Sequence, residues 1–388
     1  NTLHNFGDVD LTLFPERDFR VRLGYSFNNS KGPGTNTIRF RSDEYQVDSV
    51  VRSKSDDLRA GLEGKLLGFN IGGMFGHRRF VDGSEYINAV LNQGNNPATS
   101  TSSLNTGSRL FQIVGKTNFG NFYFQRTFAE RFDVTGRLVH SVSEVDLTET
   151  DALTGRASAT GDIIVLNRIS VPGSASRPQT RGDLGFTLRL TKKFRISNTF
   201  TFDQFNVGGS NTLFELLQST SSTGTPRSDA ITRTASWRAT SYRRLANLIE
   251  GDYQANRAFG FSVGYRFTRR DVNLAALDRN LVTGATTLNV DEPFENSTNS
   301  VLAGARIKPT TNWTIYLDLE RGESDTVFTR LANADTFSFR VRSRASVKQF
   351  SFNVSAITKN NDSPGTSVPI FSNTGVLLLP ATETVANS

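Results

Sequence analysis

Arginines at alternating positions are the residues of this sequence best placed to do chemistry. Within residues 19–27, Arg20 and Arg22 alternate with large apolar side chains, and the same spacing recurs along the chain. Successive side chains of a strand point to opposite faces, so one face would carry guanidinium groups and the other apolar groups. Guanidinium groups facing water can attract anions. The basic residues predicted on this face are Arg20, Arg22, Arg59, Arg137, Arg195, Arg266, Arg340, Arg342 and Arg344.

Two interpretations of these charges stay open on sequence alone. The first is an electropositive surface that favours anions. Its best candidates are Arg340, Arg342 and Arg344, three guanidinium groups on one strand without an acidic residue between them. The second is pairing with acidic residues of neighbouring strands, which would stiffen the sheet without selecting a solute.

The sequence offers little material for other chemistry. It has no cysteine, which excludes disulfides and thiolate ligands, and its three histidines leave little for metal or haem ligation. No nucleophile-and-base motif is present, so we expect no catalytic residues, no metal and no cofactor bound by this chain. The net charge of +7 is spread over alternating positions rather than clustered with aromatic residues, which argues against nucleic-acid binding.

The elements that would position the arginines are antiparallel strands joined as hairpins. No run of 18 apolar residues occurs, and the mean hydropathy is −0.35. Short turns alternate with polar stretches of roughly 15 to 35 residues, which we interpret as long loops. The predicted loops cover residues 28–57, 81–107, 143–180, 207–235, 271–299 and 360–388. The fourteen predicted strands are 8–14, 19–27, 58–66, 69–75, 122–128, 132–142, 183–190, 194–202, 245–253, 259–267, 301–307, 313–320, 337–344 and 350–356.

An aromatic residue follows each predicted short turn. Such repeated placement is typical of an aromatic girdle at a membrane interface, although phenylalanine is also a good strand former. The predicted girdle consists of Phe19, Phe69, Phe132, Phe194, Phe259, Trp313 and Phe350.

Together these patterns resemble those of Gram-negative outer-membrane β-barrels of the porin-like kind. The resemblance covers nearly the whole length and rests on pattern rather than on a motif. It implies a single all-β antiparallel transmembrane β-barrel domain over residues 1–388, with periplasmic short turns, extracellular long loops and outer-membrane lipid as its surroundings. Both ends would lie on the long-loop side, whereas bacterial barrels keep theirs in the periplasm. We therefore expect a barrel that is incomplete at both ends, with 16 or more strands in the whole protein.

A fainter resemblance is to the large MtrB/PioB-type barrels that sheathe multihaem cytochromes, although the N-terminal cysteine motif of that family is absent. Three hypotheses follow. The chain forms a porin-like channel for small solutes, with anions favoured by an Arg-rich lumen. Alternatively, it is a sheath or scaffold that holds a multihaem cytochrome or another partner. The third hypothesis is a soluble β-rich adhesin or binding protein, whose apolar faces would pair with a second sheet rather than form one lipid-facing belt.

Overall fold

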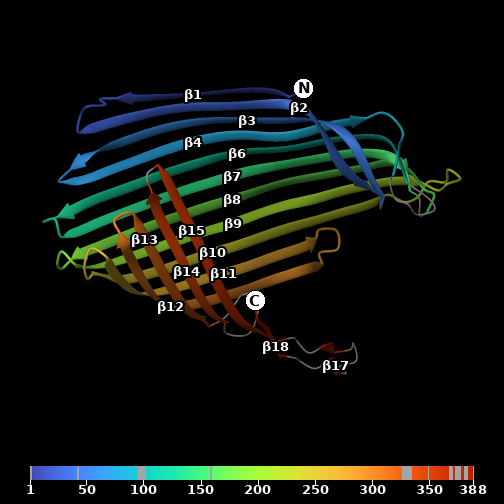
Figure 1. The fold of residues 1–388 in the computed structure, drawn as a ribbon. Coiled ribbons are helices and arrows are strands. Elements are labelled where there is room, and N and C mark those ends of the chain that lie inside the picture. The colour runs from blue at the N-terminus through green and yellow to red at the C-terminus, as the bar shows by residue number, and fades with distance from the viewer. Residues whose placement is uncertain are drawn as a thin grey trace.

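A single antiparallel sheet makes up most of the molecule (Figure 1). The computed structural model describes residues 2–41, 43–94, 102–157, 160–325, 334–347, 349–366, 370–371, 377–379 and 383–387, with side chains described as far as residue 360 except that of residue 347. Within the sheet the strands follow the order β1-β2-β3-β4-β6-β7-β8-β9-β10-β11-β12-β13-β14-β15-β18, and β5 pairs with β6. The part of the chain that the structure describes contains no helix with the length and apolarity needed to span a membrane.

The strands are long, and most are joined to their sequence neighbours by short turns. Their bounds are β1 (Leu3–Leu13), β2 (Phe19–Phe40), β3 (Asp43–Leu66), β4 (Phe69–Asn88), β5 (Asn92–Gln93), β6 (Ser103–Phe128), β7 (Phe132–Arg156), β8 (Ile163–Arg189), β9 (Phe194–Thr220), β10 (Ala230–Gln254), β11 (Phe259–Asn280), β12 (Thr286–Thr310), β13 (Trp313–Ser324), β14 (Ala334–Val347), β15 (Phe350–Thr366), β16 (Ile370–Phe371), β17 (Leu377–Leu379) and β18 (Glu383–Asn387).

The fourteen predicted strands correspond one to one to β1–β4 and β6–β15, which confirms the all-β antiparallel prediction. The predicted short turns are also present where the structure describes them; that at Leu67 and Gly68 has positive φ at both residues, as a tight hairpin turn requires. The predicted turn around Lys348 lies partly outside the described residues.

The interpretation of the polar stretches as loops was largely wrong. Residues 28–57, for example, contain the paired ends of β2 and β3, whose register continues from Phe19 opposite Gly64 to Phe40 opposite Asp43. The ladder is held by backbone hydrogen bonds, which do not depend on an apolar face, so pairing that starts beside the apolar band continues through polar sequence. The apolar alternation therefore marked only part of each strand. Similar extensions occupy much of residues 81–107, 143–180, 207–235 and 271–299.

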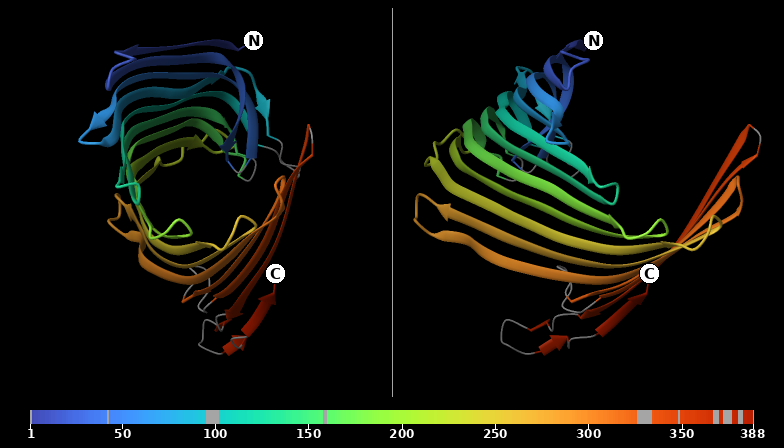
Figure 2. Two further views of the ribbon diagram at one scale, coloured as in Figure 1. Left: turned by 60° about the vertical axis from the view of Figure 1, so that its left-hand side comes forward. Right: turned by 90° about the vertical axis from the view of Figure 1, so that its left-hand side faces the viewer.

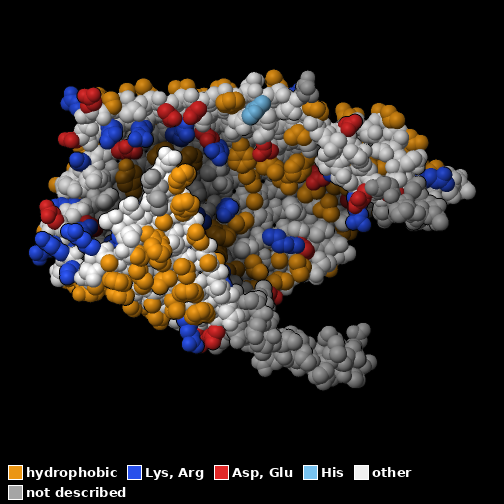
Figure 3. Space-filling view, viewed as in Figure 1, with side chains coloured by type: hydrophobic (Ala, Val, Ile, Leu, Met, Phe, Trp, Pro, Cys, Tyr) orange, Lys and Arg blue, Asp and Glu red, His pale blue; other side chains and the backbone are white. Residues whose placement is uncertain are grey.

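The sheet curls into an arc with one concave and one convex face (Figure 2). Cross-strand register keeps like side chains together: Leu23 lies opposite Leu11 and Ala60, and Leu317 opposite Ala305 and Val341. Directly paired residues lie on the same face, so the apolar residues form one continuous surface across the strands. Apolar side chains cover the near surface of β13–β15 in Figure 3, which Figure 2 identifies as the convex side. The alternating arginines therefore lie on the concave face.

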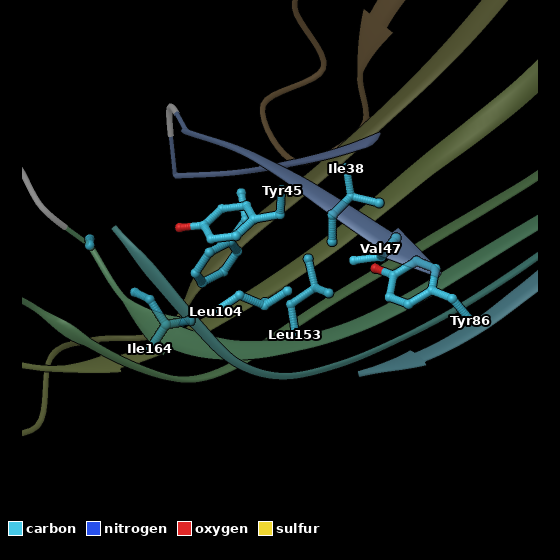
Figure 4. Packing of buried hydrophobic residues seen from close by; sticks show 9 residues of the cluster. Ile38, Tyr45, Val47, Tyr86, Leu104, Leu153 and Ile164 are labelled. Carbon is cyan, nitrogen blue, oxygen red and sulfur yellow. The ribbon is translucent and has the colours of Figure 1, made fainter. Parts of the chain in front are cut away.

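Nearly all buried apolar side chains described by the structure gather in one small cluster far from the predicted short turns. Ile38, Phe40, Tyr45 and Val47, from the facing ends of β2 and β3, pack against Leu104, Leu153 and Ile164 (Figure 4). Large apolar residues of the convex face stay exposed instead; Val263, for example, is 65% exposed. Most of the apolar surface of this sheet is therefore not covered by the chain itself.

Candidate functional site

The concave face is the candidate site, and a series of cross-strand ion pairs covers it. Six of the nine basic residues predicted from the sequence bind carboxylates there. The pairs are Arg22–Glu63 (3.0 Å), Arg59–Asp8 (2.6 Å), Arg137–Asp183 (2.8 Å), Arg195–Asp252 (2.8 Å), Arg266–Glu320 (2.7 Å) and Arg342–Asp318 (2.8 Å). Pairs outside the predicted set, such as Arg181–Asp203 (3.0 Å), continue the series.

Register explains some of these pairs directly. Arg137 lies directly opposite Asp183, and Arg195 directly opposite Asp252. Each of these two pairs joins neighbouring strands on one face, as the second interpretation of the charges requires. Because these residues are largely exposed, the pairs neutralise charge more than they stabilise the fold.

Two pairs reach across an intervening strand. Arg266 of β11 binds Glu320 of β13 across β12. Arg59 of β3 binds Asp8 of β1, and Gly24 of β2 lies between them. A Cβ atom at Gly24 would lie 2.5 Å from the Asp10 carboxylate and 2.9 Å from Nε of Arg59. The guanidinium group thus passes close over the glycine backbone, and a larger side chain at this position would displace Arg59 or Asp10.

Three predicted residues keep their charge uncompensated. Among the described residues, Arg20, Arg340 and Arg344 form no ion pair with a carboxylate. Asp318 lies opposite Arg340, but its carboxylate binds Arg342 at 2.8 Å. A groove of about 400 Å³ on this part of the concave face contains Arg340 and Arg342 in its lining.

The ends of β2 and β3 form a second feature of the concave face, which the sequence analysis missed. This hairpin tip, residues 38–47, folds over the sheet, and Arg41 reaches Glu215 of β9 at 3.7 Å. Four strands separate β3 from β9 in the sheet order, so the tip crosses part of the concave surface. The signal in the sequence was the alternation of Ile38 and Phe40 with polar residues, followed by that of Tyr45 and Val47.

Two buried tyrosines of this cluster resist ionisation. Burial, together with a smaller effect of the nearby Asp43 carboxylate, raises the pKa of Tyr45 to about 12. Burial also raises the pKa of Tyr86, with a further contribution from Asp151. Asp151 is held by two hydrogen bonds from Arg109, at 2.7 and 2.5 Å. The tip is thus packed as a small protein core, with neutral tyrosines beside a buried ion pair.

The residues of the predicted aromatic girdle occupy equivalent positions. Phe19, Phe69, Phe132, Phe194, Phe259, Trp313 and Phe350 are the first residues of β2, β4, β7, β9, β11, β13 and β15. Two of these rings contact neighbouring phenylalanines outside the predicted set; those of Phe132 and Phe186 are stacked with centroids 6.1 Å apart. The guanidinium group of Arg126 lies 4.3 Å from the centroid of the Phe128 ring. The short-turn end of the sheet therefore carries a row of aromatic residues.

Within the described part of the chain, no three histidine, aspartate or glutamate residues come together as a metal site would require. No protein-family model matches the sequence, and a comparison with curated proteins gives no match.

A comparison with solved structures gives matches of low similarity, among them hydrocarbon channels. The CymD monoaromatic hydrocarbon channel has 12% identity and a TM-score of 0.34, covering 88% of this chain and 84% of its own. The Pseudomonas putida toluene transporter TodX has 13% identity and a TM-score of 0.28, covering 90% of both chains. The Ralstonia pickettii toluene transporter TbuX has 11% identity and a TM-score of 0.29, covering 89% of both chains. At such values the likeness carries no argument, so the functional conclusion rests on the chain's own geometry.

Proposed function

We propose that this chain forms the wall of a transmembrane β-barrel in a bacterial outer membrane, with the convex face in lipid and the concave face lining a water-filled channel. The observation that carries this proposal is the pairing of a continuous exposed apolar face with an opposite face of arginines and carboxylates. A soluble protein would have to cover such an apolar surface, whereas a lipid bilayer covers it directly. The partner of the convex face is then outer-membrane lipid.

The asymmetry between the two ends of the sheet supports an orientation. Outer-membrane barrels have short periplasmic turns and longer extracellular connections. The short turns and the aromatic row would therefore lie at the periplasmic interface, and the long strand extensions would project from the outer surface. In this orientation the hairpin tip narrows the outer side of the channel.

We propose small hydrophilic solutes, with anions favoured, as the cargo of the channel. The ion-paired arginines select little because their charge is neutralised locally. Arg20, Arg340 and Arg344 are the exceptions, and uncompensated guanidinium groups in a water-filled lumen attract anions. The preference should be modest, because most arginines of the concave face are neutralised by neighbouring carboxylates.

Reversal potentials in planar bilayers test this function. The wild-type protein, purified in detergent, should conduct and should prefer chloride to potassium. The variant Arg340→Gln/Arg344→Gln should conduct equally well but shift the reversal potential towards that of an unselective pore. The control Arg17→Gln/Arg131→Gln also removes two charges, but from short turns, and should keep the wild-type selectivity.

Three results would contradict the proposal. Extraction of the protein without detergent would point to the soluble adhesin hypothesis. Haem absorbance with a stoichiometric second chain would point to a cytochrome sheath instead of a channel. Unchanged selectivity in Arg340→Gln/Arg344→Gln would leave the channel but remove the proposed basis of anion preference.

A further inference from the structure

A cationic groove lies on the concave side at the short-turn end of the sheet. It has a volume of about 780 Å³ and is lined by Lys193, Arg257, Arg306 and Lys308, together with amide and hydroxyl side chains. Lys193 belongs to the turn before β9, Arg257 to the turn before β11, and the other two to the end of β12. No carboxylate is among the residues that line this groove. It therefore differs from the rest of the concave face, where most arginines have acidic partners.

Arg306 is held in this groove by a neutral partner. Its guanidinium group donates a hydrogen bond to the side-chain oxygen of Gln254. The amide nitrogen of Gln254 donates to the backbone oxygens of Asn256 and Phe259, the latter at 2.8 Å. These bonds turn the amide oxygen of Gln254 towards Arg306. The guanidinium group is thus positioned without losing its charge.

Acidic residues near this groove are already engaged. An adjoining groove of about 500 Å³ shares Lys193, Gln254 and Arg306 with it and also contains Asp252 and Asp318. Asp252 binds Arg195 and Asp318 binds Arg342, each at 2.8 Å. Neither carboxylate is therefore available to neutralise the four cations of the cationic groove.

We propose that the cationic groove binds a multivalent anion carrying a phosphate group. The planar fork of Arg306 matches the spacing of two phosphate oxygens, and lysines supply further charge at short range. The hydroxyl groups of Thr314 and Tyr316, which also line the groove, can donate hydrogen bonds to the same oxygens. A monovalent ion would leave most of the positive charge uncompensated. The proposal does not rest on the solute preference proposed above, since none of the arginines at positions 20, 340 and 344 lines this groove.

Titration calorimetry with inorganic phosphate tests this site in the detergent-purified protein, in a chloride buffer. The wild type should bind phosphate, and Arg306→Gln/Lys308→Gln should bind it at least about tenfold more weakly, a loss of about 1.4 kcal/mol. The control Arg17→Gln/Lys65→Gln removes two cations near the turn before β2 and the end of β3, and its affinity should stay within about twofold of the wild type. Circular dichroism verifies that both variants are folded. Absence of phosphate binding in a wild type that carries no excess phospholipid, or equal binding by both variants, would overturn the proposal.

Phosphorus analysis of the same preparations distinguishes a lipid headgroup from a free anion. Excess phospholipid in the wild type over Arg306→Gln/Lys308→Gln would identify a headgroup as the bound species. Equal phospholipid in both, together with phosphate binding by the wild type alone, would identify a free anion. Both results would support binding of a phosphate group in the cationic groove. Because binding is measured without a bilayer, a failure of the channel proposal would not affect this test.

Discussion

Individual ion pairs of the concave face contribute little to stability but decide where charge remains. Exposed pairs such as Arg137–Asp183 are typically worth under about 1 kcal/mol each. Their effect is to cancel the field of most arginines, so the uncompensated residues would determine the selectivity of the proposed channel. The net charge of the concave face therefore depends on how many arginines lack a carboxylate partner, rather than on the total number of arginines.

Tyr45 gives a prediction about pH at the scale of a single residue. Its pKa is raised from 10.0 to about 12 by burial and by Asp43, so the folded tip holds the phenol proton more tightly than the unfolded chain does. The stabilisation is fully present below pH 10 and is lost as the pH rises through about 12. Tyrosinate absorbance should therefore show a late-titrating fraction among the eight tyrosines. Tyr45→Phe should reduce that fraction, and an unchanged titration in this variant would contradict the burial argument.

The hairpin tip is the element most open to perturbation, since its packing depends on a few apolar contacts. Phe40→Ala should weaken tip docking by about 3 kcal/mol, because it leaves a cavity under Tyr45 and Gly155. Hydrogen exchange of residues 38–47 should accelerate, and single-channel conductance should rise if the tip narrows the channel. Gln46→Ala is the control, because this residue lies on the exposed side of the same hairpin.

Slow exchange of the tip in Phe40→Ala, similar to that of the control, would show that the cluster in Figure 4 does not hold the tip. Faster exchange with unchanged conductance would instead show that docking of the tip does not set the width of the channel. The strand extensions outside residues 38–47 should stay protected in both variants, because backbone pairing with neighbouring strands rather than the cluster holds them.

At the scale of the whole molecule, the two faces of the sheet should respond differently to the same substitution. Val263→Arg places a charge on the convex face, which in lipid costs about 2–4 kcal/mol near the bilayer midplane. Thr199→Arg places the same charge on the concave face at a similar distance from the short turns and should be tolerated. Folding yield into lipid vesicles, followed by urea titration, measures the difference. Equal stability of the two variants would contradict a lipid-facing convex surface.

The positions of the strands and short turns, and the division of the sheet into two faces, were predicted from the sequence because they depend on local properties. Alternation of period two fixes which residues share a face, and Leu67-Gly68 or Pro15-Glu16 mark where the chain reverses. The full strand lengths could not be predicted this way, because polar residues carry no periodic signal even where backbone hydrogen bonds continue.

Only the tertiary structure decided which charges are cancelled, which segment folds over the concave face and where cations gather. Arg59 meets Asp8 across an intervening strand, and Arg41 of the hairpin tip meets Glu215 on the far side of four others. The cationic groove joins Lys193, Arg257 and Arg306 from three separate parts of the chain. These contacts arise from strand register and from the curvature of the sheet. Neither is encoded in any local pattern, because both depend on how distant strands align when the whole sheet forms.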